Sequence, residues 1–150
     1  MRNKLGLALC ALTLVAGCAS EPPSGATIAA LSSEFDTPKV TADKDCLFSA
    51  PVRNAYIANR LNGLCLYNDS QLRLYYGGKK ASLAYAWPIT DIKSWALHSD
   101  IFTVVTDSGN FGMVIKDRAG FIAVLRADNV PENQQLPEYR ARDSVPSSWM

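Results

Sequence analysis

The sequence predicts a mainly β fold with one C-terminal helix, built as a small antiparallel sheet or barrel. Three observations predict it. Short runs of alternating apolar and polar residues fill positions 64–115, and clusters of turn residues separate these runs. The spacing of apolar residues then changes to a helical one, because Phe121, Val124 and Leu125 share one face of a helix over 117–126. Asp117 is the predicted N-cap of that helix.

Six runs have the composition of strands, which favours β-branched and aromatic residues. Asn68, Asp69 and Ser70 form a turn after the first run, and Gly77 with Gly78 predicts a two-residue hairpin. Pro88 ends the third run because it has no N–H to donate, and residues 107–110 form a further turn. The six predicted strands are 64–67, 72–76, 83–87, 95–97, 101–106 and 111–115.

Residues 50–62 fit either a helix or a strand. Ser49 is a suitable N-cap, Pro51 is tolerated in a first turn, and Gly63 is suited to the position after a helix end. These signals favour a helix, although its apolar face is poorly defined. A strand over 52–61 is the alternative.

The N-terminus has the pattern of a secretory signal. Arg2 and Lys4 precede an apolar stretch over 5–16 that is too short for a permanent membrane span, and small residues precede Cys18. The ending Val15-Ala16-Gly17-Cys18 resembles the lipobox of bacterial lipoproteins. This resemblance implies removal of residues 1–17 and acylation of Cys18. Because Ala19 is not Asp, lipoprotein sorting in a Gram-negative cell favours the outer membrane, facing the periplasm.

Length and charge narrow the function further. Removal of 17 residues from the 150 leaves enough chain for one domain. The chain has 15 basic and 14 acidic residues, and loss of Arg2 and Lys4 leaves 13 basic ones, so nucleic acid is not expected as a partner. No apolar run of 18 residues follows Cys18, so the acyl chains are expected to hold the protein at the lipid bilayer.

The composition divides the mature chain into three parts. Residues 18–44 are the lipidated N-terminus and a flexible tether rich in Pro, Ser, Thr and Ala, in which Ile28, Leu31 and Phe35 also fit a short docking helix. Residues 45–128 are the globular β domain with its closing helix. Residues 129–150 are a polar, Pro-rich tail.

The four cysteines have different expected fates, which depend on their positions in the chain. Cys10 is removed with the signal, Cys18 is the lipid site, and Cys46 and Cys65 remain in an exported domain, where an even pair predicts a disulfide. Two cysteines and the lone His98 offer too few ligands for a metal site, and their spacing is not C-x-x-C. No cofactor is expected.

A chain of antiparallel strands closed by one helix resembles pleckstrin-homology-like (PH-like) and GRAM-like domains. Residues 63–72 look like their early hairpin, 87–93 resemble the step into the second sheet, and 121–125 are similar to the start of the capping helix. Seven strands are expected in that family, so 52–61 would have to supply the first. The resemblance implies a binding scaffold, and Lys79 with Lys80 are too few cations to imply a phosphoinositide site.

The candidate catalytic groups do not form a set. His98 is followed by Ser99 and Asp100 in an expected surface turn, and neighbours in sequence cannot assemble a triad. Acidic residues are placed mostly where turns and caps favour them, and only Asp91, between Ile89 and Ile92, is expected to be partly shielded. We therefore expect a protein that is not an enzyme.

The aromatic residues allow a second function. Tyr85 and Trp87 point to one face of their strand and Trp95 follows closely, so exposed rings would suit a sugar, whereas core packing is the alternative. The leading hypothesis is a membrane-anchored envelope lipoprotein that acts as a non-catalytic binding or assembly module for another envelope protein. A binder of cell-wall glycan (peptidoglycan) through Tyr85, Trp87 and Trp95 is the alternative.

Overall fold

The computed structural model describes residues 23–37, 39–44, 46–49, 57–58, 60–76, 80–138 and 140–141. The signal segment, Cys18 and the Gly77-Gly78 hairpin signal lie outside these residues. The elements, in chain order, are α1 (Gly25–Ser32), β1 (Thr41–Asp43), β2 (Leu47–Ser49), β3 (Ile57–Ala58), β4 (Arg60–Tyr67), β5 (Gln71–Tyr76), β6 (Ser82–Pro88), the 3-10 helix η1 (Ile89–Asp91), β7 (Ser94–His98), β8 (Ile101–Thr106), β9 (Gly109–Val114), α2 (Arg118–Ala127) and β10 (Arg140–Ala141).

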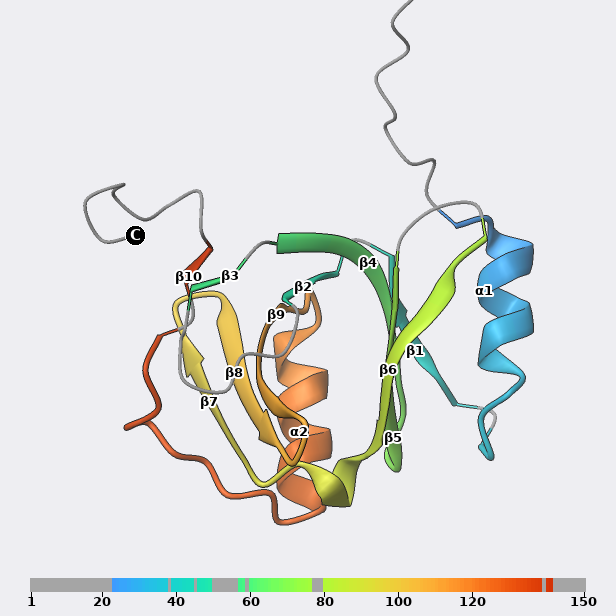
Figure 1. Ribbon diagram of the computed structural model, residues 1–150. Coiled ribbons are helices and arrows are strands. Elements are labelled where there is room, and N and C mark those ends of the chain that lie inside the picture. The colour runs from blue at the N-terminus through green and yellow to red at the C-terminus, as the bar shows by residue number, and fades with distance from the viewer. Residues whose placement is uncertain are drawn as a thin grey trace, which may run out of the picture.

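The strands form two antiparallel halves that are joined by one short strand (Figure 1). The order along the sheet is β6-β5-β4-β2-β9-β8-β7, and β1 pairs with β4 beside β2. Strand β2 pairs with β4 on one side and with β9 on the other, so it connects the two halves. Helix α2 closes the structure. The predicted mainly β fold with a C-terminal helix is confirmed.

The helix favoured over residues 50–62 is wrong for the residues that the structure describes there, and the alternative of a strand is correct for them. Ile57–Ala58 and Arg60–Tyr67 are strands, and the first strand of the seven along the sheet is β2, at 47–49. Gly63 lies within β4 rather than after a helix, and a Cβ atom there would come 2.5 Å from the Tyr75 carbonyl oxygen and overlap the Phe48 ring. Close strand packing, rather than a helix end, requires glycine at this position.

The main core lies between the two halves of the sheet and α2. Phe121 and Leu125 of α2 are fully buried, and the Phe121 ring meets the Phe102 ring of β8 edge to face with centroids 5.1 Å apart. Asp117 caps the helix as predicted, because its side chain accepts a hydrogen bond from the Gly120 N–H (2.9 Å). Tyr67 packs on Phe121 from the β4 side, with ring centroids 5.2 Å apart.

A second, smaller core covers the opposite face of β4 and β5. Phe35 is buried there with Leu64, Leu66 and Tyr75, and Ile28 and Leu31 of α1 pack against this group. The Arg73 guanidinium lies 4.7 Å from the centre of the Phe35 ring and forms an ion pair with Glu34 (3.0 Å). Figure 1 shows α1 beside the sheet on the side away from α2.

The described part of the expected tether is therefore structured. It holds α1, capped by the Ser24 side chain, and β1, whose residue Thr41 pairs with Tyr67 of β4. The alternative of a docking helix through Ile28, Leu31 and Phe35 agrees with this packing.

The start of the expected polar tail also packs on the domain. The Trp95 N–H donates to the Pro131 carbonyl oxygen (3.0 Å), the Asn133 N–H donates to the Trp95 carbonyl oxygen (2.7 Å), and Val130 is buried. Further along the chain, β10 pairs in parallel with β3. These backbone hydrogen bonds do not depend on apolar side chains, and for that reason a polar sequence did not reveal them.

Cys46 and Cys65 form the predicted disulfide, with Cα atoms 5.7 Å apart. Both residues are fully buried in the main core. The Gly63 N–H donates to the Cys46 carbonyl oxygen (2.9 Å), so the bridge and this hydrogen bond hold the segment before β2 against β4.

Candidate functional site

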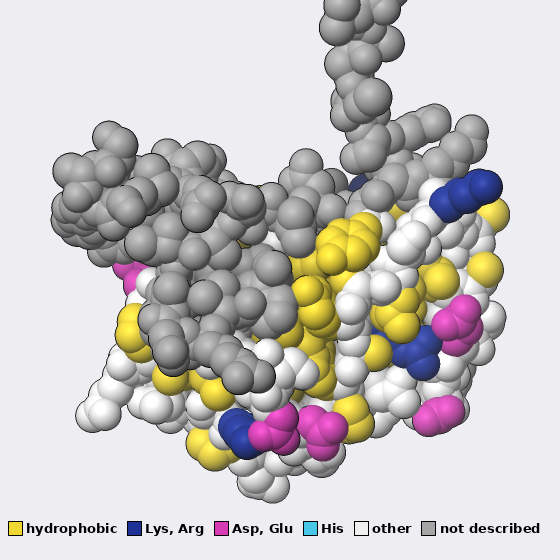
Figure 2. Space-filling view, in the orientation of Figure 1, with side chains coloured by type: hydrophobic (Ala, Val, Ile, Leu, Met, Phe, Trp, Pro, Cys, Tyr) yellow, Lys and Arg dark blue, Asp and Glu magenta, His cyan; other side chains and the backbone are white. Residues whose placement is uncertain are grey.

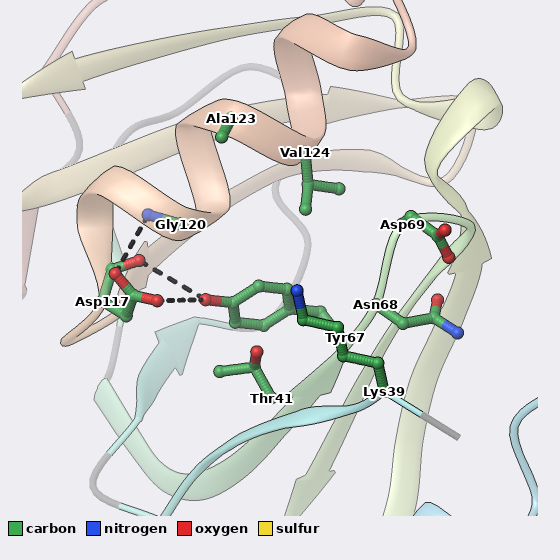
Figure 3. A pocket seen from close by; sticks show the side chains of 9 residues that line it. All are labelled: Lys39, Thr41, Tyr67, Asn68, Asp69, Asp117, Gly120, Ala123 and Val124. Atoms are coloured by element: carbon green, nitrogen blue, oxygen red, sulfur yellow. Dashed lines mark hydrogen bonds between the residues drawn. The ribbon is translucent and has the colours of Figure 1, made fainter. Parts of the chain in front are cut away.

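A polar pocket of about 350 Å³ lies between the N-terminal segment, the turn after β4 and the first turns of α2 (Figure 3). Its floor is the side chain of Tyr67, and Figure 3 shows Lys39 and Thr41 on one side of that ring and α2 on the other. The lining residues are Lys39, Thr41, Tyr67, Asn68, Asp69, Asp117, Gly120, Ala123 and Val124.

Tyr67 and Asp117 are the best-positioned polar groups of the pocket. The Tyr67 hydroxyl donates to Oδ2 of Asp117 (3.3 Å) and lies 3.4 Å from the carbonyl oxygen of the same residue. Burial and the nearby Asp117 charge raise the pKa of Tyr67 to about 12. The phenol therefore stays protonated at physiological pH and acts as a hydrogen-bond donor.

Asn68 fixes the rim of the pocket. Its Oδ1 accepts hydrogen bonds from the N–H groups of Ser70 (2.9 Å) and Gln71 (2.7 Å), which is the local geometry that places Asn in a turn. Its Nδ2 donates to the Thr37 hydroxyl (2.9 Å), so the turn between β4 and β5 is tied to the segment that carries Lys39. The predicted turn at Asn68-Asp69-Ser70 thus shapes the pocket.

A smaller hollow of about 250 Å³ continues along β1. It shares Thr41 and Asp117 with the pocket and adds Ala42, Asp43 and Lys116. The Asp43 carboxylate accepts a hydrogen bond from the Lys116 N–H (2.6 Å), and this bond joins β1 to the entry of α2. The two hollows therefore adjoin at Thr41 and Asp117.

The surface of the pocket carries groups of both charge signs. It offers an ammonium group at Lys39, carboxylates at Asp69 and Asp117, and hydroxyls at Thr41 and Tyr67. The hydrogen bonds that the structure places at this surface join the Tyr67 hydroxyl to Asp117, whose carboxylate also caps α2 through the Gly120 N–H. Groups of both charge signs suit a polar ligand surface rather than a simple anion.

The three aromatic residues do not form an exposed row. Trp95 is 1% exposed and Trp87 is 8% exposed, and both belong to the main core. Tyr85 is half-buried and stacks on Trp87 with ring centroids 5.6 Å apart, while Phe111 meets the Trp87 ring at 4.5 Å. The core alternative is therefore correct for the two indoles, because the two halves of the sheet need this bulk between them.

His98 and the aspartates are likewise dispersed. His98 is half-buried at the end of β7, where its Nε2 donates to the Leu136 carbonyl oxygen (2.7 Å), and the expected exposed turn follows it at Ser99 and Asp100. Asp91 is exposed rather than shielded. Asp100 forms an ion pair with Arg118 (2.8 Å), and Asp107 forms one with Lys93. The described residues contain no group of three His, Cys, Asp or Glu that could hold a metal ion.

Sequence reasoning missed Lys39, Thr41 and Tyr67 as pocket residues. Lys39 and Thr41 belong to the stretch that was expected to be a tether, and Tyr67 was interpreted only as a strand residue. Their meeting depends on the pairing of β1 with β4, which leaves no local sequence signal.

Comparisons with known proteins find distant structural similarity only. No protein-family model matches this sequence, and no curated protein matches it. Among solved structures, the N-terminal PH domain of human ARAP2 is similar, at 15% identity and a TM-score of 0.45, over 63% of this chain and 82% of that one. The linker-DH/PH domains of p115-RhoGEF are similar at 13% identity and a TM-score of 0.41, over 70% of this chain and 33% of that one. The strand order and the capping helix of this chain define its fold.

A search for membrane-spanning helices among the described residues finds none that is long and apolar enough.

Proposed function

We propose that this protein is a lipid-anchored binding module of the bacterial cell envelope that recognises another envelope protein. The run Val15-Ala16-Gly17-Cys18 supports the anchor, because two or three acyl chains on one cysteine hold a protein stably at a bilayer. The polar pocket beside Tyr67 supports the binding role and is the observation that carries it. Ala19 after the acylated cysteine favours the outer membrane, with the domain in the periplasm.

The partner in this proposal contacts the pocket through polar and charged groups. Lys39 offers a cation, and the capping Asp117 carries a carboxylate that accepts from the Gly120 N–H and the Tyr67 hydroxyl. Complementary charges at such a surface set specificity and association rate more than affinity. A partner surface with both an acidic and a basic group fits this arrangement.

The anchor is tested by mass spectrometry of the protein purified from envelopes. The expected mature chain begins at Cys18 and carries fatty acyl chains, and Cys18→Ser is expected to remain unprocessed or to be released as a soluble species. A mature chain with an unmodified amino terminus would show that the anchor does not exist.

The binding role is tested by affinity capture from detergent-solubilised envelopes, with the full-length protein as bait. The expected result is one reproducible partner, captured at least tenfold less by Lys39→Glu. Lys44→Glu is the matched control, because Lys44 is an exposed lysine in the same segment and does not line the pocket. Equal capture by both variants would show that the partner binds a surface other than the pocket. Repeated capture of no protein would contradict the proposed role.

A further inference from the structure

The two edge strands of the sheet, β6 and β7, differ in how their backbones are covered. The edge at β7 is covered, because the backbone of Trp95 exchanges hydrogen bonds with Pro131 and Asn133. The edge at β6 has no such cover among the described residues, where β6 pairs only with β5. An unpaired edge presents backbone donors and acceptors to any second strand.

No charged side chain of β6 guards this edge. Natural proteins protect edge strands with charges, prolines, β-bulges or very short strands. Strand β6 has seven residues without a charge. Its described guards are Pro88 at the very end and a register shift at Ala84, between the pairs Leu74–Tyr85 and Tyr75–Leu83. Leu83 is 54% exposed, and Ala86 and Pro88 are also exposed. In Figure 2, hydrophobic side chains run down the middle of the molecule, in the region where Figure 1 places β6.

The ladder between β5 and β6 shows which backbone groups point outward. The Ile89 N–H donates to the Ser70 carbonyl oxygen (2.8 Å), and hydrogen-bonded pairs alternate along an antiparallel ladder. Counting back from this pair makes Arg73 and Ala86 a non-hydrogen-bonded pair. The N–H and C=O of Ala86 therefore point away from β5, towards the free edge, and the small side chain leaves room for a neighbour.

We propose that the occupant of this edge is a second copy of the same chain, with the two β6 strands antiparallel about a two-fold axis at Ala86. An isologous contact requires a self-complementary surface. The uncharged strand meets no like charge in its copy. Lys80 lies before the start of β6 and Asp91 lies in η1 after its end, both exposed, so antiparallel pairing places a Lys80 and an Asp91 from different copies at each end of the contact. The contact depends on neither the anchor nor the pocket.

The geometry is tested by cysteine cross-linking of the full-length protein in membranes. Directly opposed residues of a hydrogen-bonded antiparallel pair have Cα atoms about 5.5 Å apart, which a disulfide can span. Ala86→Cys is therefore expected to give an oxidised dimer of twice the chain mass, at least fivefold above the control Ala119→Cys, an exposed position on α2. Dimer at the control level, or an adduct of another mass, would overturn the second copy as occupant.

The orientation is tested by charge reversal of the detergent-solubilised protein in sedimentation velocity. Lys80→Glu is expected to weaken the dimer by about threefold to tenfold, because it places like charges at both symmetric ends of the contact. The double variant Lys80→Glu/Asp91→Lys is expected to restore it. A double variant that is as weak as the single one would contradict the antiparallel pairing, and a wild-type protein that remains monomeric would overturn the contact altogether.

Discussion

Removal of the disulfide is expected to cost this domain about 3 kcal/mol. Cys46 and Cys65 are 19 residues apart, and closure of a loop of this length removes about 3 kcal/mol of chain entropy from the unfolded state. The perturbation is the double variant Cys46→Ala/Cys65→Ala, because a single replacement would leave an unpaired buried thiol among core side chains. For a domain of this size the melting temperature should fall by about 10 °C.

The assay is thermal unfolding by circular dichroism in oxidising buffer, with urea unfolding for the free energy. Wild-type protein in strong reductant should lose about as much stability as the double variant, and the double variant should not respond to reductant. An unchanged melting temperature, or a further loss when the double variant meets reductant, would refute the reasoning, since only the Cys46–Cys65 bridge can respond in this scheme.

Three further predictions test the packing. Gly63→Ala should destabilise the domain by about 1–3 kcal/mol, because the new Cβ would meet Phe48 and the Tyr75 carbonyl. Gly25→Ala is the control and should not destabilise the domain, because open space surrounds Gly25. Equal urea unfolding midpoints for the two variants would contradict this prediction. Phe35→Ala should cost about 3 kcal/mol and speed hydrogen exchange in α1, and unchanged α1 protection would show that Phe35 does not hold the helix. The pKa of Tyr67 is raised from 10.0 to about 12, so the folded state holds this proton more tightly and stability should fall as pH rises from 10 to 12. Tyr67→Phe should lessen this fall, and an unaltered pH profile would remove Tyr67 as its cause.

The sequence predicted the middle of the domain best. The six predicted runs correspond to strands β4–β9. The described residues of β4 do not alternate between core and surface, because the main core takes Cys65 and Tyr67 on one face and the smaller core takes Leu64 and Leu66 on the other. Phe121 and Leu125, both buried, identified the helix. Within β5, Tyr75 is buried and the next residue, Tyr76, is 43% exposed.

The N-terminal part and the pocket could not be predicted in this way. Strand β2 has only three residues, too few to show a period, and it was preceded and followed by signals that fit a helix. No residue of α1 is itself fully buried, and its strongest anchor, Phe35, lies after the helix end. The pocket needs Thr41 opposite Tyr67, a contact between distant segments that neither segment encodes alone.

The packing of α1 on the sheet limits the distance between the domain and the bilayer in the anchored form that we propose. A free chain over 19–44 would let the globule wander, but packing from α1 onward leaves only residues 19–24 between the acylated cysteine and the first helical residue. Fully extended, six residues reach roughly 20 Å. The domain would thus lie close to the lipid headgroups, and a partner would have to bind it at the membrane surface.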